Sequence, residues 1–241
     1  MIANFDIQWP CDLDKNTQQQ LTDIAIPISG LSQIKHSAPP TRKGRGVFYV
    51  AKGLISVSFA ADGPQSMSGG LLGEGLWLGG SLMMTQMLIN ANIEEVKPTE
   101  LLYFPKEKIE KLAETNPFIY KWLYFSAGQV QQSWLQSQVA SLHDKETRII
   151  ATLLSILDKS QSIRGAVPHI NISQKQLSTI TGISRPRLNE VLKKLEGENK
   201  ISLARGKVYF EDLESLTKQL QPIKEILPNL DRYVEEFISK F

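Results

Sequence analysis

The residues with the clearest capacity for chemistry lie in one segment, ISQKQLSTITGISRPRLNEVLKKLEGENKIS, at residues 172–202. Ser173 and Gln176 have the spacing of a helix capping box, and Gly182 supplies the left-handed conformation in which helices commonly end. A second helical pattern follows that glycine. The two short helices and the turn between them predict a helix-turn-helix. The apolar stripe of the second helix consists of Leu188, Val191, Leu192 and Leu195.

The beginning of this second helix is basic. Arg185 and Arg187 flank Pro186, and two cations at a helix N-terminus oppose the helix dipole at roughly 0.3–1 kcal/mol each. We interpret this placement as a sign that an anionic partner provides compensation. Ser184 is the expected cap, but proline disfavours the helical conformation at the residue before it, which would move the start one residue later.

The anionic partner that best fits this pattern is double-stranded DNA. A recognition helix enters the major groove with its N-terminal end first, so arginines there can reach guanine edges or phosphates. Two alternating segments around Arg205-Gly206-Lys207 then predict a winged hairpin with a basic tip. The predicted DNA-binding residues are Ser173, Gln174, Ser184, Arg185, Pro186, Arg187, Asn189, Glu190, Arg205 and Lys207.

The distribution of charge supports the same hypothesis. The net charge of the 241 residues is only +2. Residues 1–158 hold 13 basic and 15 acidic side chains (−2), residues 159–210 hold 10 and 3 (+7), and residues 211–241 hold 4 and 7 (−3). Local basicity without global basicity is the electrostatic footprint of a module that docks on phosphates. The alternative is a solvated surface with a chance excess of lysine.

Several other functional classes are disfavoured by composition. The single cysteine, Cys11, rules out an intramolecular disulfide or a Cys-based zinc site, and the three histidines show no ligand spacing. We therefore expect no metal and no cofactor. With no nucleophile–base arrangement or phosphate loop, we do not expect an enzyme. No apolar run is long enough for a bilayer and no secretory signal is present, so we expect a cytoplasmic protein with no membrane partner.

The elements that must position the basic segment can be traced along the chain. After a short helix at NTQQQLTDI, residues 45–104 are rich in glycine, β-branched and aromatic residues. GVFYVAKGLISVSFA reads as two strands joined at Ala51-Lys52-Gly53, and a strand at residues 100–104 precedes another short helix. These features favour a barrel or roll. A helix capped by Asp144, with an apolar stripe, leads to the basic segment. Residues 218–241 form a further amphipathic helical pattern.

A long helix is predicted between these two regions, at residues 117–142. Small and apolar residues recur along it at coiled-coil spacing, which predicts a dimer interface in which two helices approach closely. An ordinary helix packed within one chain is the alternative. The predicted interface residues are Ile119, Leu123, Ser126, Val130, Ser133 and Ser137.

From about residue 15 to residue 215, this order of elements resembles the Crp/Fnr family of bacterial transcription regulators. The resemblance implies an α+β protein: an N-terminal β-roll (cupin-like) sensor domain at residues 1–116, a dimerisation helix at 117–143, and a winged helix-turn-helix DNA-binding domain with a C-terminal helical extension at 144–241. It also implies a homodimer on a roughly palindromic operator, with half-sites about one helical turn apart. RNA polymerase is a further candidate partner.

The sequence departs from the family at two sites. Members that bind cyclic AMP carry a Gly-Glu pair followed by Arg-Ser or Arg-Thr, whereas this chain has Gly79-Gly80 and Ile89-Asn90. Burying a phosphate without the arginine is prohibitive, so we predict no binding of cyclic AMP in the family manner. In the recognition helix the best-known members place Arg, Glu and Arg where Arg185, Pro186 and Glu190 stand, so the operator need not be the familiar one.

Alternatives remain open at this point. The sensor region could respond to an unknown apolar or small effector, or could be degenerate, which would leave an effector-independent regulator. The winged helix could also serve as the scaffold of a protein-interaction module.

Overall fold

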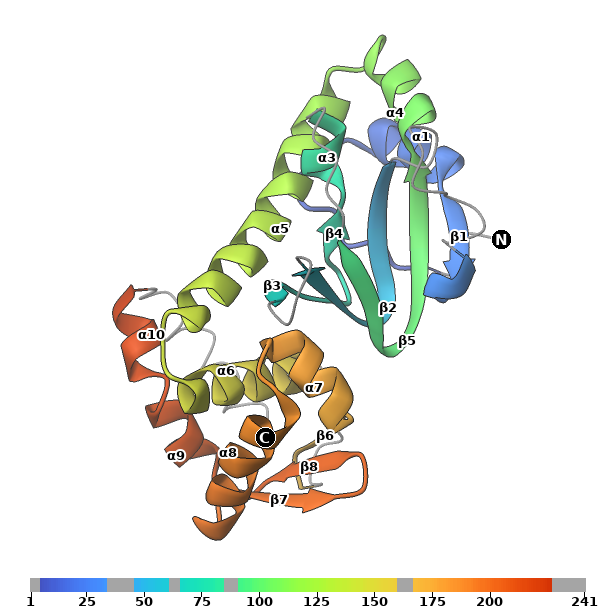
Figure 1. Cartoon of the computed structure of the whole chain (residues 1–241). Coiled ribbons are helices and arrows are strands. Elements are labelled where there is room, and N and C mark those ends of the chain that lie inside the picture. The colour runs from blue at the N-terminus through green and yellow to red at the C-terminus, as the bar shows by residue number, and fades with distance from the viewer. Residues whose placement is uncertain (1–4, 34–45, 61–65, 85–90, 160–166, 227–241) are drawn as a thin grey trace. The chain divides into compact units, whose positions relative to one another are not determined.

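A computed structural model describes residues 5–33, 46–60, 66–84, 91–159 and 167–226 of the chain (Figure 1). The chain divides into two compact units. The N-terminal unit comprises Met1–Ser56 and Leu72–Ser133, and the C-terminal unit comprises Val57–Leu71 and Trp134–Phe241. No helix in the described ranges is both long enough and apolar enough to span a membrane.

An antiparallel sheet with two long strands forms the first half of the chain. Strands β2 (Gly46–Ala60) and β5 (Asn92–Pro105) are central in the order β1-β5-β2-β3, with β4 (Trp77–Leu78) paired to β2. Strand β1 is Ile26–Ser29 and β3 is Ser66–Gly73. The prediction of two strands joined at Ala51-Lys52-Gly53 is wrong, because β2 is continuous over 15 residues. Gly53 makes this possible: it has φ +93°, and a Cβ atom there would lie 2.2 Å from the Pro98 carbonyl oxygen.

Aromatic side chains fill the core of the N-terminal unit. Trp77 and Trp122 are fully buried and meet edge to face with ring centroids 5.3 Å apart. Tyr49 and Phe104 contact Trp77 from β2 and β5 at 4.7 and 5.2 Å. Each such aromatic pair stabilises the folded state by about 0.5–1.5 kcal/mol beyond the stabilisation that comes from burying its apolar area. Helices α1 (Lys15–Ile24), α3 (Gly80–Met84) and α4 (Lys106–Ala113) complete this half of the chain.

The long helix α5 (Phe118–Ser141) forms as predicted, but its first turns face its own unit. Ile119, Leu123 and Ser126 are 0%, 3% and 0% exposed, and the first two belong to the aromatic core cluster. The prediction that these three residues form a dimer interface is therefore wrong, because the N-terminal unit already covers them. Val130, Ser133 and Ser137 are half-buried.

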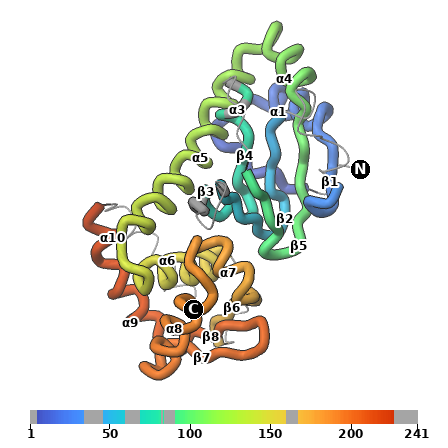
Figure 2. Tube along the Cα trace, in the orientation of Figure 1, coloured from blue at the N-terminus to red at the C-terminus, as the bar shows by residue number. Residues whose placement is uncertain are grey.

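The C-terminal unit contains the predicted winged helix (Figure 2). Helices α6 (Lys145–Asp158), α7 (Gln174–Thr181) and α8 (Arg185–Gly197) contact one another, and β6 (His169–Asn171), β8 (Lys207–Phe210) and β7 (Ile201–Ala204) form an antiparallel sheet in that order. Asp144 caps α6 as predicted, accepting hydrogen bonds from the backbone N–H groups of Glu146 and Thr147. Two short helices follow, α9 (Leu213–Lys218) and α10 (Gln221–Ile226), and the rest of the predicted extension lies outside the described residues.

Candidate nucleic-acid interface

The start of α7 is fixed by the predicted capping box. The Ser173 hydroxyl accepts a hydrogen bond from the Gln176 backbone N–H at 3.2 Å and donates to Gln176 Oε1 at 2.8 Å. The Ser173 backbone N–H also donates to that oxygen, at 3.0 Å. Because the Ser173 hydroxyl hydrogen is engaged within the helix, a phosphate here would be bound mainly by the first backbone N–H groups of α7, at exposed Gln174 and Lys175.

The turn between α7 and α8 is held by side-chain hydrogen bonds. Gly182 ends α7 in the left-handed conformation, with φ 64° and ψ 19°, as predicted. The Ser178 hydroxyl donates to the Ile183 carbonyl at 2.7 Å, and the Ile183 backbone N–H donates to the Thr181 hydroxyl at 3.3 Å. These bonds tie α7 to Ile183, one residue before the Ser184 cap position of α8.

Helix α8 begins at Arg185, directly after Ser184. Proline at the second helical position did not delay the start, since its missing N–H has no intrahelical partner there in any case. Ser184 occupies the cap position, but its side chain makes no capping hydrogen bond, contrary to the expected role. Its exposed hydroxyl therefore remains available to a partner. Leu188, Leu192 and Leu195 bury the opposite face of the helix, whereas Val191 is half-buried.

The residues at the open face of α8 are exposed and form no ion pair with the part of the chain that is described. Arg185, Pro186, Arg187 and Glu190 are all exposed, and among the described residues neither arginine forms a salt bridge. Asn189 differs from the other predicted readers, because it is half-buried and its Oδ1 atom is enclosed without a hydrogen-bond donor within the part of the chain described.

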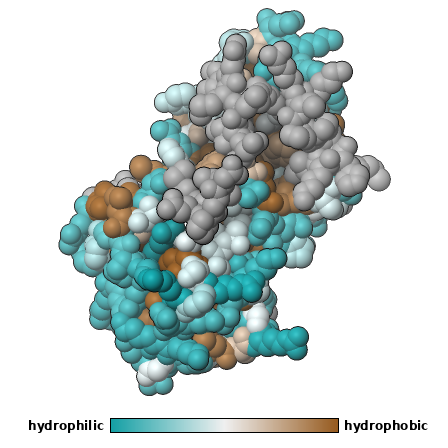
Figure 3. Space-filling model, in the orientation of Figure 1, coloured by the Kyte–Doolittle hydropathy of each residue, from teal (hydrophilic) through white to brown (hydrophobic). Residues whose placement is uncertain are grey.

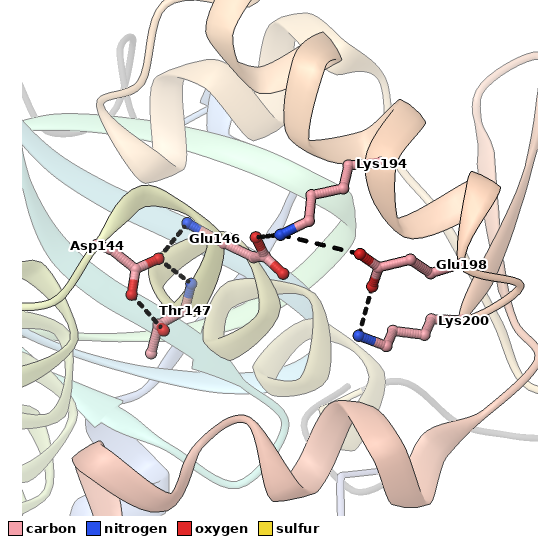
Figure 4. A network of polar contacts seen from close by, with 6 residues as sticks. All are labelled: Asp144, Glu146, Thr147, Lys194, Glu198 and Lys200. Atoms are coloured by element: carbon pink, nitrogen blue, oxygen red, sulfur yellow. Dashed lines mark hydrogen bonds and ion pairs between the residues drawn. The ribbon is translucent and has the colours of Figure 1, made fainter.

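The last turns of α8 hold a network of charges (Figure 4). Lys194 Nζ lies 2.5 Å from Glu146 Oε2 on α6 and 3.9 Å from Glu198 Oε1. Glu198 Oε2 in turn lies 2.5 Å from Lys200 Nζ. The hydrogen bond to Glu146 raises the pKa of Lys194, and the hydrogen bond from Lys200 lowers the pKa of Glu198. Lys194 and Lys200 are thus balanced by neighbouring carboxylates.

The wing carries its basic residues at the turn, as predicted. Strands β7 and β8 pair with Ala204 opposite Lys207, and Gly206 between them has φ +72°. Arg205 and Lys207 are exposed and form no salt bridge with any described residue. The hairpin therefore presents two uncompensated charges next to α8, which contacts β7.

Two further cations belong with this set but were not among the predicted site residues. Lys175 in the first turn of α7 and Lys193 on α8 are exposed and likewise form no salt bridge within the described ranges. The signal for Lys175 was its place beside Gln174 in the first turn of a capped helix. On the face shown in Figure 3, the surface of the C-terminal unit is mostly hydrophilic. The arrangement can bind a polyanion through several charges at once.

The glycines at the sequence departure in the N-terminal unit have structural roles. Gly79 has φ +95°, and a Cβ atom there would lie 2.3 Å from the Gly46 carbonyl oxygen. A Cβ atom at Gly80 would lie 3.1 Å from backbone atoms of Leu123 and Ala127 in α5, so this glycine permits close contact between α3 and α5. Ile89 and Asn90 lie outside the described residues. Among the residues described, no three His, Cys, Asp or Glu side chains are grouped so as to hold a metal ion.

Comparison with known sequences supports the assignment of the C-terminal unit. A family described as the Crp-like helix-turn-helix domain matches residues 147–219. The cyclic AMP receptor protein of Thermus thermophilus is 25% identical over 166 residues, covering 68% of this chain and 74% of its own. The cAMP-activated global transcriptional regulator CRP of Pasteurella multocida is 27% identical over 172 residues, covering 68% of this chain and 80% of its own.

Solved structures share the fold of most of the chain. A transcriptional regulator of the crp/fnr family from Eubacterium rectale superposes with a TM-score of 0.65 at 17% identity, covering 86% of this chain and 95% of its own. The c-di-GMP-responsive global regulator CLP of Xanthomonas campestris gives a TM-score of 0.63 at 19% identity, covering 82% and 99%. At these identities the likeness shows the fold.

Proposed function

We propose that this chain, a transcription regulator of the Crp/Fnr type with a Crp-like helix-turn-helix domain, acts as a homodimer that binds a specific, roughly palindromic DNA operator. Each protomer would place α8 in the major groove of the DNA and the wing on the neighbouring phosphate backbone. RNA polymerase would be a further partner. Half-sites would then lie about one helical turn, or ~10 base pairs, apart.

One observation carries the DNA-binding proposal. The cations of α7, the N-terminal half of α8 and the wing are exposed and have no carboxylate partner among the described residues, whereas Lys194 and Lys200 are paired. A surface that served only solubility would mix its charges along the whole helix. Unpaired cations at the end of α8 that leads into a groove are expected where phosphates and base edges complete the site.

DNA binding is tested by titrating the full chain with a duplex of random sequence at several salt concentrations. The proposal predicts that log Kd rises linearly with log salt, because about 0.9 counterions are released per phosphate contact. Binding that does not change with salt, or no binding at 50 mM salt, would contradict it.

The homodimer proposal is supported by a face of α5 other than the one the sequence suggested. Tyr120, Tyr124 and Phe125 are 55%, 74% and 43% exposed, on a helix whose opposite side is buried. Gly128 follows one turn later, and nothing lies within 4 Å of a Cβ atom built on it. An interior helical glycine costs about 1 kcal/mol relative to alanine, so nothing in the described part of one protomer explains Gly128. A second copy of α5 crossing closely at Gly128 would supply one and would cover the aromatic residues.

Sedimentation of three variants separates this proposal from a monomer. We expect Tyr124→Ser and Gly128→Leu to shift the equilibrium toward monomer, because the first removes buried apolar area and the second blocks close approach. Ile93→Ser, which removes an apolar side chain of β5 that is 39% exposed, is the matched control and should leave the dimer intact. A wild-type monomer at micromolar concentration, with and without DNA, would contradict the proposal.

We further propose that the effector is not cyclic AMP, although both curated relatives carry cyclic AMP in their names. Gly79 and Gly80 stand where the cyclic AMP cassette begins, and neither has a side chain to offer a ligand. An effector-independent regulator is the alternative, favoured by the same glycines and by the contact that Gly80 allows with α5. Calorimetric titration with cyclic AMP, and then with a panel of metabolites, tests both proposals. Heat from stoichiometric binding of cyclic AMP would contradict the proposal that cyclic AMP is not the effector.

A further inference from the structure

The basic residues of α8 are not equivalent, and their spacing shows why. Seven residues make about two helical turns, so Arg187 and Lys194 share one face of α8 roughly 10 Å apart. Both are exposed, and Glu190 and Val191 lie between them on that face. Of the four basic side chains on α8, only Lys194 forms a salt bridge with another described residue.

The partner of Lys194 comes from another helix, where a capping hydrogen bond fixes its backbone. Glu146 lies in the first turn of α6, where its backbone N–H donates to Asp144 Oδ1 at 2.8 Å. Its side chain is 22% exposed, against 55% for Lys194. Figure 4 shows Lys194 extending from α8 toward Glu146, with Glu198 on its other side. The lysine charge therefore faces two carboxylates within 4 Å.

The effect of this contact on stability is expected to be small, because exposed ion pairs contribute a median of about 0–1 kcal/mol. Its effect on the charge offered to DNA is larger. A lysine that must leave two carboxylates to reach a phosphate gains little by doing so, whereas an unpaired lysine releases about one counterion. The contact with Glu146 thus removes Lys194 from the non-specific contacts that α8 can make to DNA phosphates.

We propose that Glu146 is a positioning residue that raises the sequence specificity of DNA binding by holding Lys194 out of the phosphate contacts of α8. This inference rests on the proposed DNA-binding function. In this arrangement the salt-dependent, non-specific affinity comes from Lys175, Arg187, Lys193 and the wing, and Lys194 adds none.

The test compares four proteins on random duplex DNA and on a selected operator across a salt series. Glu146→Gln should steepen the dependence of log Kd on log salt by about 0.9 per protomer and should lower the ratio of specific to random binding. Lys194→Gln should leave the slope unchanged, and the double variant should return it to the wild-type value. Glu214→Gln, which breaks the exposed pair with Lys218 at 2.7 Å in α9, is the control for a gain of one positive charge.

Three outcomes would overturn the inference. One is a Lys194→Gln variant whose slope of log Kd against log salt falls as much as that of Lys207→Gln, because Lys194 would then already contact a phosphate in the wild-type protein. This result can be obtained even if Glu146→Gln does not fold. Another is a Glu146→Gln variant that matches Glu214→Gln in slope and specificity ratio. Wild-type protein that binds no DNA would instead refute the proposed function itself, and this inference with it.

Discussion

Replacing Arg185 should remove sequence discrimination more than affinity. Arg185 is the first residue of α8, is exposed, and forms no salt bridge with any described residue. Its guanidinium group can therefore form bidentate hydrogen bonds to guanine O6 and N7, which alanine cannot form. Lys207, on the wing, is the natural comparison, since it is equally exposed but placed for the DNA backbone.

The expected magnitudes differ in kind. A bidentate contact to guanine discriminates by about 1–3 kcal/mol, so Arg185→Ala in both protomers should cost about 2–6 kcal/mol on the operator, or ~30-fold at the lower limit. Lys207→Ala should remove one phosphate contact per protomer and flatten the log–log salt slope by about 1.8 for the dimer. When salt is raised from 50 to 200 mM, the wild-type dimer should therefore lose about 12-fold more affinity than the Lys207→Ala dimer.

Fluorescence anisotropy with labelled duplexes measures both effects. Each variant is titrated against a selected operator and a scrambled duplex of equal length at four salt concentrations. We expect Arg185→Ala to bring the two affinities together, and Lys207→Ala to weaken both by the same factor. If both variants lowered operator and scrambled binding equally, the assignment of Arg185 to base reading would be refuted.

Two predictions concern stability. In urea denaturation, Trp77→Phe should destabilise the N-terminal unit by about 1–2 kcal/mol more than Trp122→Phe. The Trp77 indole N–H donates to the Gln8 carbonyl at 2.9 Å, whereas the buried Trp122 N–H has no partner among the described residues. Equal losses of stability would contradict this reasoning. Asp144→Ala should cost about 1 kcal/mol at pH 7 through loss of the α6 cap. Hydrogen bonds from the Thr147 backbone and its neighbours lower the pKa of Asp144, so this stabilisation is complete above the ordinary carboxyl pKa of about 4 and is lost as the pH falls through the lower folded-state value. The difference in melting temperature between wild type and variant should therefore shrink as the pH is lowered from 7 to 3, and a constant difference would show that the charge of Asp144 does not matter.

Local chemistry made much of the C-terminal unit predictable. The capping box at Ser173, the left-handed Gly182 and the cap at Asp144 each depend on a few neighbouring residues, and all three formed as expected. The wing turn at Gly206 is likewise local. The order of these elements also carried the resemblance to the Crp/Fnr family; the Crp-like helix-turn-helix domain matches residues 147–219, and a solved Crp/Fnr regulator shares the fold.

The errors arose where distant segments decide the outcome. Seven-residue spacing along α5 identified a stripe of small and apolar residues, but spacing cannot say what covers the stripe. Ile119 and Leu123 proved to pack in the core of their own chain, and the exposed aromatic face around Tyr124 was left unassigned. In the same way, Gly53 reads locally as a turn, yet its role is to let β2 continue past Pro98 of β5.

The central claim, that this chain reads a specific DNA sequence as a dimer, is tested most directly by selecting bound fragments from a pool of random duplexes. The account predicts enrichment of a roughly palindromic site whose half-sites are centred about 10 base pairs apart, with a conserved guanine in each half-site that is lost in a selection with Arg185→Ala. A bound pool without any enriched sequence, or with a single unrepeated half-site, would contradict it.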